Sequence, residues 1–235
     1  MDTRTVSSIE VVRGSSSVLY GSDALGGVIV TQPLDPRFRS LSTPFRLTPR
    51  TTFRLTTADG ERGGRFEVEA QVRDRVSVLA GAGFRTVGLL EGGGVLRNPA
   101  DGEPAVVPRM DDDGRTQLGT GYDELTFDAR VVARLGSDRR LTAALYGYRE
   151  TDAPRTDQCP AAFAPWNECL TYEEQFRTLA YVAFDGDVGP AARALRLSLS
   201  YQRQHERRRL DRPSSHVELT GVDDADTFGV VARAR

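Results

Sequence analysis

The chain has 235 residues, enough for one or two ordinary domains, with 27% charged and 39% hydrophobic side chains. The formal net charge is −2, so no overall basic field indicates nucleic acid as a partner. All 31 Lys+Arg positions are arginine, which excludes the lysine of phosphate-binding loops, Schiff bases and Ser-x-x-Lys nucleophiles. Since no run of about 18 apolar residues occurs, the sequence predicts no transmembrane helix.

The first predicted elements are two short strands, Ile9 to Val12 and Val28 to Thr31, joined by a loop rich in serine and glycine. The loop has neither the Gly-Lys-Ser/Thr nor the G-x-G-x-x-G pattern of a phosphate cradle. Gly14 to Ser17 also lacks the G-x-S-x-G pattern of a hydrolase nucleophile. The loop glycines suit positive φ or close backbone packing, and they are Gly14, Gly21, Gly26 and Gly27.

These residues resemble the closing segment of the plug domain of TonB-dependent outer-membrane receptors. The resemblance rests on three blocks at fixed spacing: Glu10 to Gly14, Ser17 to Gly21, and Ala24 to Ile29. It covers about the first tenth of the chain, and the sequence departs from the family at Ser15, usually proline, and at Val30, usually asparagine. The plug motif residues are Glu10, Arg13, Gly14, Tyr20, Gly21, Gly26 and Gly27.

The resemblance implies two regions: residues 1–36 are the C-terminal end of a plug domain, and residues 37–235 are the N-terminal strands of an outer-membrane β-barrel. It implies that 1–36 lies inside the barrel against a polar wall. Arg13 is then a candidate for an ionic contact with inward-facing carboxylates, and contact with nearby plug carbonyls is the equal alternative.

After Pro44 the sequence alternates between apolar and polar residues, as a strand with one apolar face does. The clearest run sets Leu125, Phe127, Ala129, Val131 and Ala133 against charged and hydroxyl neighbours. About eight strands are predicted; the first lies near 50–57, the last near 226–235, and the others are 65–73, 76–85, 124–135, 141–150, 172–185 and 195–202.

Two architectures fit this alternation: an antiparallel sandwich and a membrane barrel. Runs of roughly ten residues or more favour the barrel because they can cross a bilayer at a tilt. The connections also favour it, since short links near Asp74, 136–139 and 185–191 alternate with long loops at 91–119, 152–171 and 205–222. Polar faces with charges of both signs suit a plugged or water-filled lumen.

The long loops contain the remaining candidate sites. Cys159 and Cys169 share the 152–171 loop on the exterior, oxidising rim, which predicts a disulfide between them; the alternative is free thiols or metal ligands. Asp111 to Asp113 could bind Ca²⁺, but a solvated loop tip is favoured. His205 and His216 are interpreted as loop histidines beside the Arg207–Arg209 cluster, so no metal or catalytic residue is proposed.

The predicted fold is therefore all-β: a partial transmembrane antiparallel barrel of about eight strands, preceded by a short plug remnant. The predicted function is that of a receptor fragment, not an enzyme, for energised uptake of a scarce large ligand such as a ferric siderophore or cobalamin. No cofactor is expected. The expected partners are the TonB complex, through a missing N-terminal part, outer-membrane lipid and a metal chelate. The alternative is a secreted β-sandwich or adhesin-like binding module.

Overall fold

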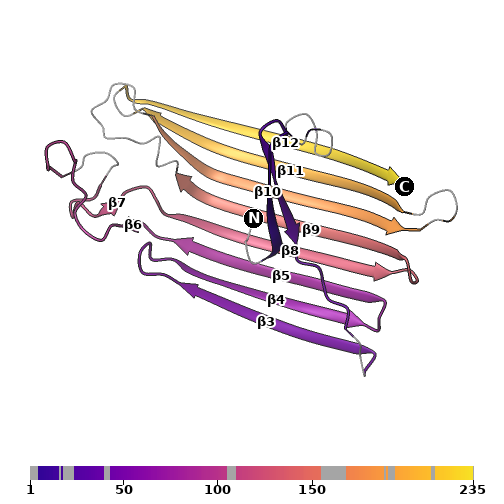
Figure 1. Ribbon diagram of the computed structural model, residues 1–235. Coiled ribbons are helices and arrows are strands. Elements are labelled where there is room, and N and C mark those ends of the chain that lie inside the picture. The colour runs from indigo at the N-terminus through magenta and orange to yellow at the C-terminus, as the bar shows by residue number, and fades with distance from the viewer. Residues whose placement is uncertain are drawn as a thin grey trace.

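Eight long strands form one curved antiparallel sheet in the computed structural model (Figure 1). The structure describes residues 5–15, 17, 24–39, 43–104, 110–154, 168–187, 189, 194–212 and 215–234. The strand order is β12-β11-β10-β9-β8-β5-β4-β3. The bounds are β3 (Phe45–Leu55), β4 (Arg62–Val72), β5 (Val76–Val87), β8 (Tyr122–Arg134), β9 (Arg139–Pro154), β10 (Cys169–Gly186), β11 (Leu195–Arg212) and β12 (Val217–Ala234).

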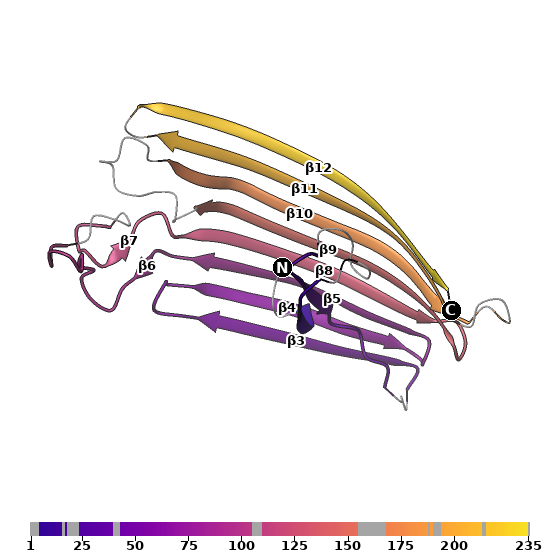
Figure 2. The same cartoon turned by 45° about the horizontal axis from the view of Figure 1, so that its top comes forward.

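Two smaller hairpins accompany the sheet. β1 (Val6–Arg13) pairs with β2 (Gly27–Pro33) in the N-terminal region, which confirms the two short strands predicted there. This hairpin lies across the inner side of the sheet, with its strands running crosswise to those of the sheet (Figures 1 and 2). β6 (Leu90–Glu91) and β7 (Thr116–Gln117) pair within the long connection between β5 and β8. The described residues include no helix long and apolar enough to cross a membrane.

One face of the sheet is a continuous apolar surface, called here the outer belt. Its middle row passes through hydrogen-bonded strand partners across all eight strands: Leu47, Ala70, Val78, Val131, Ala143, Val182, Leu199 and Val230. Leu199 is 62% exposed and Val230 is 77% exposed. Such exposed apolar area on a sheet face requires a covering layer or a lipid surface. Since no second sheet packs on the belt among the described residues, the sandwich alternative is wrong.

The opposite, inner face is polar, as strand alternation requires. Its buried polar side chains are Arg65, Glu67, Gln71, Ser77, Thr126, Asp128, Arg130 and Thr142, and the described residues Leu79, Val132, Ala144 and Ala183 are buried beside them. Buried ionic groups are costly unless they are paired and hydrogen-bonded, so these residues need partners on the inner side. The segment after β2 supplies several of them. The polar side of the alternation therefore faces the N-terminal region, as predicted.

The largest difference from the predicted strand boundaries lies in the third long connection; smaller ones are the start of β3 at Phe45 and the ends of β9 and β10 within 152–171. The segment 205–222, predicted as a long loop, belongs mostly to β11 and β12. β11 ends at Arg212, and β12 begins at Val217. Charged and other polar residues predominate on both faces of the strands there, so no sustained alternation indicates a strand. Ion pairs hold this extension instead, including Arg203–Asp224 at 3.4 Å and Arg207–Glu174 at 2.7 Å.

The sheet is open. β3 and β12 are its edge strands. The eight strands therefore do not close into a small complete barrel. Unpaired edges of this length are a liability in water, and they are normally continued by further strands or covered.

Candidate functional site: the inner face and the N-terminal hairpin

The centre of the inner face is an ionic cluster around Arg65, which is 3% exposed. Its guanidinium contacts Asp128 on β8 at 2.6 Å and Glu67 on its own strand at 3.2 Å. Two carboxylates beside one buried guanidinium compensate the cost of removing that charge from water. The cluster ties β4 to β8 across β5, and it makes the wall charged rather than apolar at its centre.

A second cluster joins the wall to the N-terminal region. Asp35, which follows β2, contacts Arg130 of β8 at 2.5 Å and Arg140 of β9 at 2.8 Å. The guanidinium of Arg130 also donates to the hydroxyls of Tyr146, at 3.3 Å, and Tyr181. The Arg130 side chain is 11% exposed, whereas that of Arg140 is 38% exposed. Arg130 is therefore the more strongly desolvated of the two partners of Asp35.

The backbone of residues 37–39 is hydrogen-bonded to inner-face side chains. The amide of Arg37 donates to Glu69 at 2.8 Å, and its carbonyl oxygen accepts a bond from Ser77 at 3.0 Å. Gln71 accepts from the amide of Arg39 at 2.9 Å and donates to its carbonyl oxygen at 2.8 Å. This reciprocal pairing satisfies buried groups on both partners. Residues 35–39 are named the anchor segment below.

Phe38 adds a cation–π contact to the anchor segment. The guanidinium carbon of Arg134, on β8, lies 3.9 Å from the centroid of the Phe38 ring. A cation over an aromatic face within about 6 Å is attracted to the ring. The anchor segment thus contacts β4, β5, β8 and β9 through side chains of several kinds.

A cleft of about 560 Å³ separates the hairpin β1–β2 from the inner face. The hairpin side of its lining consists of Thr5, Thr31 and Pro33, and the sheet side includes Tyr146, Tyr148, Gln175, Arg177, Tyr181 and Gln202. The rings of Tyr146 and Tyr181 are stacked with centroids 6.4 Å apart. Aromatic faces with a few polar groups line clefts that accept small molecules, and the volume lies in that range.

The plug motif residues occupy the hairpin and the loop that joins its strands. Gly27 begins β2 at φ 148°, and a Cβ there would meet the carbonyl oxygen of Val12 at 2.6 Å. Gly14, at φ 93°, donates from its amide to the carbonyl oxygen of Gly26 at 3.3 Å. Glu10 accepts a bond from Gln32 at 3.3 Å. Tyr20 and Gly21 lie outside the described residues.

Arg13 ends β1 and is exposed. Among the described residues it makes no ion pair with a wall carboxylate, so the contact expected of it stays a prediction. The described contact between the two regions has the reverse polarity, because the acid, Asp35, comes from the N-terminal region and the arginines come from the wall. Sequence reasoning missed Asp35, Arg130 and Arg140.

The histidines and the arginine cluster that were predicted to lie in loops are found at different places in the fold. His205 is not a loop residue: it lies in β11, between Asp224 at 2.9 Å and Glu174 at 3.2 Å. His216 lies in the turn between β11 and β12, at φ 53°. The Arg207–Arg209 cluster also lies in β11, where Arg207 and Arg209 pair with Glu173. The loop interpretation of His205 and of this cluster was wrong because strands continue past the outer belt.

In the acidic loop at Asp111 to Asp113, the carboxylate of Asp113 accepts hydrogen bonds within the turn. Asp113 accepts bonds from the hydroxyl of Thr116 at 2.6 Å and from the amides of Arg115 and Thr116 at 2.7 and 2.8 Å. The hydroxyl bond, followed by the two amide bonds, lowers the pKa of Asp113 below its ordinary value. These contacts describe a local turn cap in the solvated loop.

Cys169 is the first residue of β10, and no described cysteine is free. Cys159 lies outside the described residues. The Cys159–Cys169 disulfide therefore stays a prediction.

Comparisons with known proteins agree with this architecture. Residues 1–28 match the family model of the TonB-dependent receptor plug domain. A solved structure, the FrpB iron transporter from Neisseria meningitidis (F3-3 variant), resembles the chain with a TM-score of 0.69 at 14% sequence identity. The likeness covers 97% of this chain and 34% of the transporter, so the chain spans about a third of that protein's length. No curated protein matches.

The class of protein follows from these findings. An N-terminal hairpin with the plug signature rests on the polar face of an open antiparallel sheet, and that sheet has the fold of part of an outer-membrane transporter barrel. By its N-terminal signature and its fold, the chain resembles part of a TonB-dependent receptor.

Proposed function

We propose that the chain forms part of an outer-membrane receptor that takes up a scarce, large ligand with energy supplied through the TonB complex. The anchor segment carries this proposal. It fixes a hairpin with the plug signature to the polar face of a sheet whose other face is apolar, through Asp35 on Arg130 and Arg140. A plug must bind the barrel wall and must also be able to separate from it. Ion pairs between the plug and the wall allow both.

The division at residue 36 is part of the proposal. Residues 1–36 form the end of the plug, and residues 37–235 form barrel strands, with Asp35 at the boundary. In the complete gene product the unpaired edges of β3 and β12 would be continued by other strands. The TonB complex would act through a part of the plug other than the described hairpin.

The ligand class is argued from two observations. The cleft between hairpin and wall has stacked tyrosines beside amide and guanidinium groups, which suit a flat, partly anionic organic molecule. The similar solved structure is described as an iron transporter, which favours a ferric chelate over cobalamin. Membrane lipid is the natural partner of the outer belt, and the proposed location is the outer membrane.

The test is uptake by cells with and without the complete gene. Cells that carry it should accumulate iron from one or more labelled ferric siderophores, and accumulation should stop when the proton gradient is collapsed or the TonB complex is removed. Labelled cobalamin serves as the comparison ligand. Surface binding that persists without any energy-dependent accumulation, for every chelate and for cobalamin, would contradict the proposal.

A further inference from the structure

Arg149 lies on the outer face of β9, at the end of the outer belt near the long connections. Its guanidinium donates to the carbonyl oxygens of Tyr148 and Arg177 at 2.8 and 2.9 Å and to the hydroxyl of Thr178 at 3.0 Å. The rings of Phe127 and Phe176 flank it, with centroids 5.6 and 5.2 Å from the guanidinium carbon. All of these partners are neutral.

The neighbouring cations of the same face have carboxylate partners. Arg203 pairs with Asp224, and Arg207 pairs with Glu174. Within the described part of the chain, no carboxylate lies at salt-bridge distance from Arg149. A guanidinium between two aromatic rings is partly removed from water, and an anion stabilises such a charge. Arg149 therefore presents a cation whose counter-ion is not supplied by the described residues.

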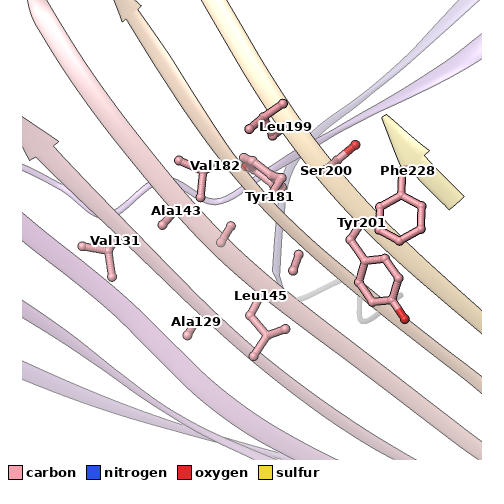
Figure 3. Close-up of a pocket in the computed structure, with 12 residues that line it drawn as sticks. Ala129, Val131, Ala143, Leu145, Tyr181, Val182, Leu199, Ser200, Tyr201 and Phe228 are labelled. Carbon is pink, nitrogen blue, oxygen red and sulfur yellow. The ribbon is translucent and has the colours of Figure 1, made fainter. Parts of the chain in front are cut away.

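A shallow apolar groove of about 520 Å³ lies on the outer belt (Figure 3). Short side chains on three successive strands, Ala129, Ala143 and Ala180, line it. Larger residues beside them are Leu145, Val182, Leu199, Tyr201 and Phe228. The rings of Tyr201 and Phe228 lie together with centroids 5.1 Å apart. The groove is apolar and open, which suits a flexible hydrocarbon chain rather than a compact polar molecule.

The groove and Arg149 are connected along β9. The outward positions between Leu145 and Arg149 include only Gly147, and the Phe127 ring lies over it. Four residues of strand span about 13 Å, so the guanidinium lies roughly that far along the sheet from the groove. Phe127 and Phe176 lie at this level of the sheet, and aromatic residues gather in the same way at the boundary between hydrocarbon and headgroups.

We propose that Arg149 and this groove form a binding site for one phosphorylated lipid of the outer leaflet, lipid A. A phosphate of its headgroup binds the guanidinium of Arg149, and an acyl chain lies along Ala129, Ala143 and Ala180. The long connections mark the exterior rim, so the leaflet in contact with Arg149 is the outer one. The planar guanidinium matches phosphate oxygens in geometry and charge. This inference rests on the proposed outer-membrane location.

The experiment uses the complete gene product, purified from outer membranes in mild detergent, stripped of lipid and titrated with lipid A during native mass spectrometry. Arg149→Gln should weaken binding of lipid A about tenfold, which corresponds to roughly 1.4 kcal/mol. Arg203→Gln is the matched control, because that charge is already paired with Asp224. Lipid A without its phosphates should bind the wild-type protein as weakly as intact lipid A binds the Arg149→Gln variant.

A groove variant separates the two halves of the site. Ala180→Phe should weaken both forms of lipid A, whereas Arg149→Lys should retain part of the phosphate preference. Heat-modifiable migration in gels confirms that each variant is folded. Equal affinities of wild-type protein and Arg149→Gln, or a stronger preference for phosphatidylethanolamine than for lipid A, would overturn the inference. Energy-dependent uptake is measured separately, so loss of the lipid site and failure of the proposed function give different results.

Discussion

Asp35 offers the sharpest test of how the hairpin is held. Its carboxylate contacts Arg130 at 2.5 Å and Arg140 at 2.8 Å, and its own side chain is 46% exposed. Asp35→Asn removes the negative charge and leaves two arginines facing a neutral amide. Removal of one partner from a fully buried pair costs about 3–5 kcal/mol, whereas exposed pairs contribute about 0–1 kcal/mol. For a half-exposed acid we expect a loss of about 1–2 kcal/mol.

The two arginines should contribute unequally. Arg130 is the less exposed partner, so its coupling to Asp35 should be about 1 kcal/mol, while the Arg140 coupling should stay below about 0.5 kcal/mol. The Arg130 coupling is limited because Tyr146 and Tyr181 still accept bonds from its guanidinium in the variant. Double-mutant cycles with Arg130→Gln and Arg140→Gln isolate the two terms.

The assay is denaturant unfolding of the complete gene product in detergent micelles, with proteolysis near residue 35 as a local readout. Asp187→Asn is a suitable control, because this acid lies in the turn after β10, outside the anchor segment. Cleavage should be faster in Asp35→Asn and unchanged in the control. A coupling to Arg140 larger than that to Arg130, or no change in either readout, would refute the assignment of Asp35 as the ionic contact of the anchor segment.

Four further outcomes are expected. Gly27→Ala should destabilise the hairpin by more than about 1 kcal/mol, because its Cβ would meet the Val12 carbonyl oxygen at 2.6 Å. In the control variant Gly26→Ala the added Cβ would meet no atom within 4 Å, and the rate of proteolysis within residues 5–39 compares the two variants. Leu199→Arg should cost about 2–4 kcal/mol in bilayers, since it puts a charge in the outer belt; a folded fraction equal to that of wild-type protein in vesicles would contradict the lipid-facing assignment. Because the pKa of Asp113 is lowered, the stabilisation that its carboxylate gives the loop should be present above pH 3.8 and lost as the pH falls through the lowered pKa. Hydrogen exchange of the Thr116 amide should show this loss, and Asp113→Asn should abolish the pH dependence. Thiol titration of unfolded, unreduced protein should find no free group, while two groups would exclude the Cys159–Cys169 disulfide.

The sequence alone determined the class of fold and the two faces of the sheet. Strict alternation, as in Leu125 to Ala133, fixes which side chains share a face because successive strand residues point in opposite directions. The spacing of the glycines in the N-terminal segment indicated the hairpin, since Gly27 can approach the Val12 carbonyl oxygen only without a Cβ. Both signals are local, so they can be recognised in a single sequence.

The tertiary structure decided what depends on distant partners. The extensions of β11 and β12 carry polar residues on both faces, so no periodicity marked them, and only ion pairs between strands, such as Arg203–Asp224, show why they form. The anchor segment could not be predicted either, because Asp35 meets arginines about a hundred positions later in the chain. An ionic contact between distant residues leaves no periodic trace in a sequence. It exists only once the register of β8 and β9 brings Arg130 and Arg140 to the same place on the inner face.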